Sequence, residues 1–212
     1  MFDTLLFDLD GTLTDSYEGI ANSVLYALER MNRPPIGSDV LSLFIGPPLT
    51  DSFKNYCGMS DDQAETALKL YRERYSTVGW AENRVYDGVP EALHKLKAMG
   101  KTMFVATSKP EHFARKIVER FELLQYFDGV FGATFDSSRT TKDSVVEYAL
   151  DTAHADKAKT VMIGDRKHDV LGAKANGIKS IGVLYGFGDL AELKTAGADF
   201  IAPTPEDICG LM

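Results

Sequence analysis

Two acidic side chains follow the first apolar stretch of the chain at a spacing that suits chemistry. The stretch LLFDLDGTLTDS ends its apolar run at Phe7 and places Asp8 and Asp10 two residues apart. In extended backbone this spacing turns both side chains to one side. Because a buried carboxylate is costly to desolvate, two acids at the end of a buried strand need a cationic partner. A hard divalent ion bound by oxygen ligands, most simply Mg²⁺, meets that need.

Further side chains that could bind a metal ion or a phosphate lie later in the chain. Hydroxyl groups and a lysine follow a second apolar stretch, a further lysine opens a helical pattern, and GDRKHD holds two acids one helical turn apart. These residues are Thr107, Ser108, Lys109, Lys142, Asp165 and Asp169. Four carboxylates, hydroxyls and lysines at one place would suit metal-assisted phosphate chemistry.

Each motif also has an ordinary structural explanation. Asp10-Gly11 suits a type I′ hairpin turn, although the residues after Leu13 do not continue with strand alternation. Thr107 and Ser108 could cap the following helix, and Lys142 alone fits a solvated helix start. The order of the motifs along the chain is what favours a common site.

A parallel sheet would bring these motifs together, because the carboxyl ends of its strands meet at one edge. Apolar, β-rich runs predict strands at 4–7, 102–106, 129–133, 160–163, 180–183 and 199–202. Helical patterns between them lie at about 89–99, 110–121, 142–153, 166–176 and 189–196. The alternation predicts a doubly wound α/β core, in which ligands bind at the strand ends.

A helical block interrupts this alternation after the first strand. Apolar spacing and breaks at NRPPIGSD and FIGPPLTD predict helices at about 15–31, 38–44, 49–57 and 60–78. We therefore expect a core formed by residues 1–15 and 85–212, with residues 16–84 inserted as an all-helical second domain.

Composition and net charge indicate which partners the protein is not expected to bind. The 212 residues are 44% hydrophobic and 25% charged, as in ordinary globular proteins, and carry a formal net charge of −8. That charge repels a nucleic-acid polymer. No apolar run reaches the length of a membrane span, Met1-Phe2-Asp3 does not begin a leader pattern, and Cys57 and Cys209 are too few for a disulfide framework. We expect a cytoplasmic protein without membrane or nucleic-acid partners.

The motifs resemble, in order, those of the haloacid dehalogenase superfamily. The matching stretches are FDLDGTLTDS, VATSKP, Lys142 and MIGDRKHDVLGAKANGI. The chain is similar to the phosphoglycolate phosphatase-like branch, above all to bacterial cytosolic 5′-nucleotidase-like members, which FIGPPLTDSF and GVLYGFG also resemble. The resemblance implies a Rossmann-like core, a helical cap and a Mg²⁺-dependent phosphatase acting on a small phosphate ester.

The resemblance also implies catalytic roles. Asp8 is expected to attack phosphorus and become an aspartyl phosphate. Asp10 is expected to protonate the leaving oxygen and then to activate water. Thr107 is expected to bind the phosphoryl oxygens, and Lys142 to offset the charge of Asp8 and the phosphate.

Metal and substrate contacts are implied in the same way. The expected metal ligands are Asp8, Asp165, Asp169, directly or through water, and Asp10 through its backbone carbonyl. The expected substrate contacts are Gly11, Thr12, Ser108 and Lys109, with Gly46 and Pro47 from a stiff loop of the cap. Three cap cations, Lys54, Arg72 and Arg74, are candidates for an anionic part of the substrate, or are simply solvated helix residues.

The expected substrate is a nucleoside 5′-monophosphate first and phosphoglycolate second. A sugar-phosphate phosphomutase is the nearest alternative, because such enzymes resemble the same motif set. A phospho-accepting signalling domain, also α/β with clustered acids and Mg²⁺, is a further alternative of a different class.

Overall fold

The structure is a computed structural model that describes residues 1–134 and 138–212. Contacts between residues divide the chain into two compact units. The core unit comprises Met1–Thr14 and Val85–Met212, and the inserted unit comprises Asp15–Arg84. The predicted roles of these units, catalytic core and cap, stay predictions.

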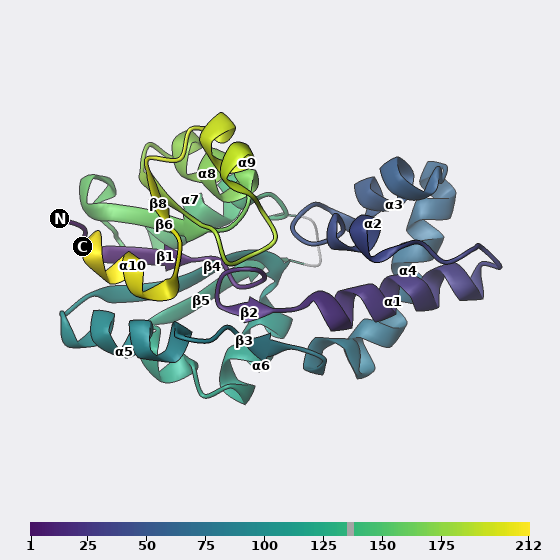
Figure 1. Cartoon of the computed structure of the whole chain (residues 1–212), viewed down its shortest axis with the longest axis horizontal. Helices are drawn as coiled ribbons and strands as arrows, with labels where there is room; N and C mark the ends of the chain where they lie inside the picture. The colour runs from purple at the N-terminus through teal and green to yellow at the C-terminus, as the bar shows by residue number, and fades with distance from the viewer. Residues whose placement is uncertain (135–137) are drawn as a thin grey trace. The chain divides into compact units, whose positions relative to one another are not determined.

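The core unit is built on a six-stranded sheet in the order β5-β4-β1-β6-β7-β8, and every neighbouring pair is parallel (Figure 1). Its strands are β1 (Thr4–Phe7), β4 (Thr102–Pro110), β5 (Gly129–Ala133), β6 (Thr160–Gly164), β7 (Lys179–Val183) and β8 (Phe200–Ala202). Because β1 lies between β4 and β6, its carboxyl end is at the centre of the sheet edge. The predicted doubly wound α/β fold is confirmed.

Helices cover both faces of this sheet (Figure 1). One face carries α5 (Val89–Ala98), α6 (Glu111–Arg120) and α10 (Pro205–Gly210), and the other carries α7 (Lys142–Thr152), α8 (Lys167–Ala175) and α9 (Leu190–Ala196). Leu6 pairs in register with Phe104 and Met162, and these side chains pack against Val146 of α7 and Ala173 of α8. This apolar layer fixes α7 and α8 over the central strands.

The structure differs from the sequence predictions in three respects. The strand predicted at 102–106 continues as β4 to Pro110, because β5 keeps pairing with it across a register shift between Thr107 and Pro110. Two short strands, β2 (Thr14–Asp15) and β3 (Arg84–Val85), pair with each other where the chain enters and leaves the inserted unit. A last helix, α10, was not predicted.

The inserted unit is helical between its two flanking strands. Its helices are α1 (Tyr17–Arg30), α2 (Ser38–Ser42), α3 (Leu49–Cys57) and α4 (Asp61–Thr77), followed by the 3₁₀ turn η1 (Gly79–Ala81). The α4 helix begins with a capping box between Ser60 and Gln63. A Cβ at Gly19 would lie 2.0 Å from the carbonyl oxygen of Gly79, so glycine allows α1 to lie against η1.

The described helices include none with the length and apolar character needed to cross a membrane.

Candidate active site

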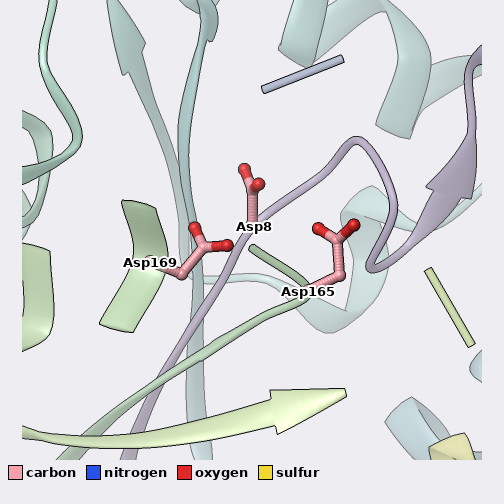
Figure 2. A group of neighbouring side chains, drawn as sticks. All are labelled: Asp8, Asp165 and Asp169. Carbon is pink, nitrogen blue, oxygen red and sulfur yellow. The ribbon is translucent and has the colours of Figure 1, made fainter. Parts of the chain in front are cut away.

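Three aspartates from separate parts of the sequence lie together at the carboxyl edge of the core sheet. Asp8 follows β1, Asp165 follows β6, and Asp169 lies in the first turn of α8. Each offers a carboxylate oxygen within 4.8 Å of the other two, and all three side chains are buried (Figure 2). A Cβ at Gly164 would lie 2.1 Å from Asp169 Cγ, so glycine at the end of β6 makes room for this carboxylate.

Lys142 supplies a positive charge to this cluster. It is the first residue of α7, and its Nζ lies 2.7 Å from Asp8 Oδ1 and 2.8 Å from Asp169 Oδ1. The same ammonium donates a hydrogen bond to the carbonyl oxygen of Ala106 at 3.1 Å. A Cβ at Gly172 would lie 2.8 Å from Lys142 Cγ, so α8 leaves room for the lysine stem.

Burial and mutual repulsion shift the pKa values in the cluster. Burial raises the pKa of Asp165, and the charges of Asp169 and Asp8 raise it further. Burial raises the pKa of Asp169 to about 6, although the Lys142 ammonium opposes that shift. Burial by itself lowers the pKa of Lys142, but the carboxylates of Asp169 and Asp8 outweigh it and hold this pKa above its usual range. One lysine against three carboxylates leaves an excess of negative charge, which a divalent cation would balance.

Asp10 faces a different partner from Asp8. Its Oδ2 lies 2.6 Å from Nζ of Lys109, which is itself buried, and its carboxylate is not part of the three-aspartate cluster. The other carboxylate oxygen, Oδ1, is buried without a hydrogen-bond partner among the described residues. Asp10 therefore holds an acceptor that a substrate oxygen could use, while its predicted contact with the metal through the backbone stays a prediction.

The turn after β1 is closed by backbone hydrogen bonds. Leu13 and Thr14 both donate their N–H groups to the carbonyl oxygen of Leu9, and Gly11 has a φ of 86°, which glycine adopts without strain. The chain then enters β2, which pairs with β3 and not with β1. The hairpin explanation of Asp10-Gly11 is therefore wrong.

The remaining predicted contacts in the core unit lie near these residues. Thr107 is buried in β4, and its Oγ1 accepts a hydrogen bond from Lys109 N at 3.3 Å. The adjacent Ser108 is half-buried. Thr12 is fully buried and donates its hydroxyl to Asp165 Oδ1 at 3.5 Å, so it contacts a candidate metal ligand.

The predicted substrate contacts of the inserted unit lie in and around its loop 43–48. Gly46, with a φ of 104°, and Pro47 occupy this loop between α2 and α3, and their contact with a substrate stays a prediction. Two of the candidate cations have acidic partners within the unit. Lys54 lies 3.3 Å from Asp51, and Arg74 forms two hydrogen bonds with Glu82 at 2.7 and 2.8 Å. These pairs favour a structural role for both cations.

Sequence reasoning missed several contacts that hold the site. The pairing of Lys109 with Asp10 was not foreseen, nor was the hydrogen bond from the backbone N–H of Phe187 to Asp165 Oδ2 at 2.8 Å. The second contact had one signal in the sequence, because Gly186-Phe187-Gly188, separated from a predicted strand by two residues, places a glycine on each side of an aromatic residue.

Comparison with known proteins identifies the family of the chain. The sequence model of the haloacid dehalogenase-like hydrolases matches residues 5–183. A 5′-nucleotidase of Pseudomonas aeruginosa is 45% identical over 193 residues, which cover 91% of this chain and 87% of the relative. A tyrosine-protein kinase of Mycobacterium tuberculosis, PtkA, is 40% identical over 94% of this chain and 65% of its own length.

The solved structures include a close match. The crystal structure of a predicted phosphatase from Clostridium acetobutylicum superposes with a TM-score of 0.95 at 42% identity, covering 100% of this chain and 98% of the other. The family predicted from the motifs is thus confirmed. The chain belongs to the haloacid dehalogenase-like hydrolases and is a phosphatase of that family.

Proposed function

We propose that the chain hydrolyses a small phosphate monoester through an aspartyl phosphate on Asp8, with Mg²⁺ as the cofactor. The observation that carries the proposal is the position of Asp8, whose Oδ1 lies 2.7 Å from the Lys142 ammonium inside a buried cluster of three carboxylates. The Lys142 ammonium offsets negative charge that Asp8 and an approaching phosphate would otherwise place against each other. The other oxygen, Oδ2, is the one we assign to attack.

Proton transfer falls to Asp10 in this proposal. The attack of Asp8 on phosphorus breaks the bond to the leaving oxygen, which takes a proton from Asp10. Asp10 then removes a proton from the water that hydrolyses the aspartyl phosphate, so that Asp8 is regenerated and inorganic phosphate is released. The unpartnered Oδ1 of Asp10 supports the second of these steps, since a buried acceptor without a partner can take the proton of the attacking water.

The donor set fits Mg²⁺. Asp8, Asp165 and Asp169 offer hard oxygen ligands in a buried cluster with excess negative charge, and Mg²⁺ prefers such ligands. Bound there, the ion would neutralise charge on the phosphate oxygens. The hydroxyl of Thr107 is assigned to the phosphoryl group, as are the backbone N–H groups of Leu9 and Asp10. The N–H of Gly11 is not assigned to it, because it donates to the carbonyl oxygen of Thr14 at 2.8 Å.

A nucleoside 5′-monophosphate is the substrate we propose first, and phosphoglycolate second. Support comes from the relative named 5′-nucleotidase, which shares 45% identity over most of both chains. A panel of nucleoside 5′-monophosphates, sugar phosphates and phosphoglycolate, assayed for phosphate release with Mg²⁺ or with a chelator, tests the assignment. A phosphomutase would instead interconvert isomers with little free phosphate, and a kinase would place the phosphoryl group on a protein tyrosine.

Two variants test the nucleophile. Asp8→Asn should abolish phosphate release, whereas Asp3→Asn is the matched control, because Asp3 precedes the same strand but is an exposed partner of Lys159. Borohydride reduction during turnover should convert an aspartyl phosphate at position 8 into homoserine, which peptide mass spectrometry would locate. Full activity of Asp8→Asn, or in the chelator, would overturn the proposed mechanism.

A further inference from the structure

The segment Leu184–Gly188, here called the strap, connects β7 to α9 in the core unit. Its first residue donates a backbone hydrogen bond to the carbonyl oxygen of Ala202 at 3.1 Å. Directly after the strap, the side chain of Asp189 caps α9 by accepting a hydrogen bond from Glu192 N at 2.8 Å. Both ends of the strap are therefore held by regular structure.

The middle of the strap bonds to a candidate metal ligand. The backbone N–H of Phe187 donates to Asp165 Oδ2 at 2.8 Å, and the hydroxyl of Thr12 donates to Oδ1 of the same carboxylate at 3.5 Å. One donor on each oxygen fixes the rotation of the Asp165 carboxylate. Such donors around a metal ligand usually set its orientation and its affinity for the ion.

Glycines allow the strap to approach this closely. A Cβ on Gly186 would lie 2.2 Å from the carbonyl oxygen of Gly11 and 2.4 Å from Asp165 Cβ, and a Cβ on Gly188 would lie 1.9 Å from the carbonyl oxygen of Asp165. Neither strap glycine has a positive φ, so the backbone conformation does not itself demand glycine. The requirement comes from space alone, because backbone atoms cannot move aside as a flexible side chain would.

Three further contacts hold the surroundings of Asp165. The ring of Tyr185 packs edge-on against the ring of Tyr86, with centroids 5.4 Å apart. From α9, the carboxylate of Glu192 accepts hydrogen bonds from Arg166 Nε at 2.9 Å and Lys167 N at 2.8 Å. The strap thus contacts the side chain of Asp165, and the start of α9 contacts the two residues that follow it.

We propose that the strap is a positioning element for the metal site, in which Gly186 permits the N–H of Phe187 to hold Asp165 in the orientation that binds the ion. The inference rests on the proposed Mg²⁺ site and adds residues that lie outside its ligand set. A carboxylate oriented before the ion arrives loses less freedom on binding, so the strap raises affinity for Mg²⁺.

Calorimetric titration of Mg²⁺ into Gly186→Ala, without substrate, tests this role directly. Loss of a residue that supports a metal ligand commonly weakens metal binding by about 10- to 100-fold, and we expect a change of that size. The matched control is Gly210→Ala at the end of α10, where an added Cβ meets nothing within 4 Å. Circular dichroism should show that both variants are folded, and higher Mg²⁺ concentrations should restore phosphate release to Gly186→Ala.

The outcomes separate this inference from the proposed function. Equal Mg²⁺ affinity in the wild type and folded Gly186→Ala would overturn the positioning role and leave the function standing, whereas no Mg²⁺ binding by the wild type would overturn both. If Gly186→Ala does not fold, amide NMR of the wild-type chain decides. The Phe187 resonance should move on addition of Mg²⁺ while that of Gly210 stays, and a stationary Phe187 resonance would overturn the inference.

Discussion

Replacing Lys142 with methionine takes a positive charge away from three buried carboxylates while keeping most of the side-chain volume. Lys142 Nζ contacts Asp8 at 2.7 Å and Asp169 at 2.8 Å. Removing one partner of a buried ion pair costs about 3–5 kcal/mol, because the other charge stays buried without compensation. For a chain of this size each kcal/mol shifts Tm by about 2–4 °C, so Tm should fall by about 6–20 °C in the metal-free protein.

The stability lost in Lys142→Met should depend on pH and on Mg²⁺. Burial raises the pKa of Asp169 from an ordinary value of 3.8 to about 6, which means that the folded state binds this proton more tightly than the unfolded state. This group therefore makes the metal-free fold more stable as pH falls from above 6 towards 4. Without the Lys142 ammonium the mutual repulsion of the carboxylates is no longer offset, so the variant should lose most stability near pH 8 and less near pH 5. Mg²⁺ should raise the Tm of Lys142→Met by more than it raises that of the wild type.

Thermal unfolding followed by circular dichroism, at pH 5 and pH 8, with Mg²⁺ or a chelator, measures each of these effects. The matched control is Lys101→Met, since Lys101 is equally buried at 7% exposure but donates to the carbonyl oxygen of Phe2, away from the carboxylates. The control should lose stability without any added response to pH or Mg²⁺. An equal loss for Lys142→Met at both pH values, or a Mg²⁺ response no larger than that of the control, would refute the electrostatic reasoning.

Three further predictions concern the effect of pH on Mg²⁺ binding and the contacts of two arginines, one in each unit. As pH falls through about 6, a proton competes with Mg²⁺ for Asp169, so Mg²⁺ affinity should weaken by on the order of tenfold per pH unit. Calorimetry from pH 8 to 5 measures this affinity, and a constant value would contradict the prediction. Arg74→Met should lower the free energy of unfolding by about 1 kcal/mol or less, because the guanidinium is paired with Glu82. It should leave KM unchanged, and a large rise in KM would instead indicate that Arg74 contacts the substrate. Arg139→Ala removes a charged hydrogen bond to Glu111 at 2.9 Å and another to a backbone carbonyl. The free energy of unfolding should fall by about 1.5–3 kcal/mol. Denaturant unfolding measures this loss, and an unchanged midpoint would show that these hydrogen bonds do not stabilise the fold.

The sequence was enough to place the centre of the site. Asp8, Lys142 and Asp165 lie far apart along the chain, but strand and helix alternation implied a parallel sheet, and parallel strands end at one edge. The types of residue at those ends, together with the motif order, then pointed to phosphate chemistry. Burial of Asp8 and Asp165 could be expected for the same reason, since both follow central strands.

Contacts that depend on tertiary geometry could not be read in this way. The N–H of Phe187 bonds to Asp165, and a backbone donor leaves no signature in residue type. Arg74 looked like a free cation because its partner Glu82 lies beyond the end of its own helix. Similarly, β4 extends to Pro110 because β5 pairs with it, and nothing in the local sequence reveals that pairing.

The short sheet of β2 and β3 has a consequence for how this architecture tolerates change. Because Thr14–Asp15 pairs with Arg84–Val85, the two points where the chain leaves and rejoins the core lie side by side. In topological terms, the whole inserted unit is an enlarged hairpin loop on the core. The entropy of closing such a loop grows slowly with its length. A shorter, longer or differently folded segment could therefore be grafted between these two strands without altering the register of the six-stranded sheet.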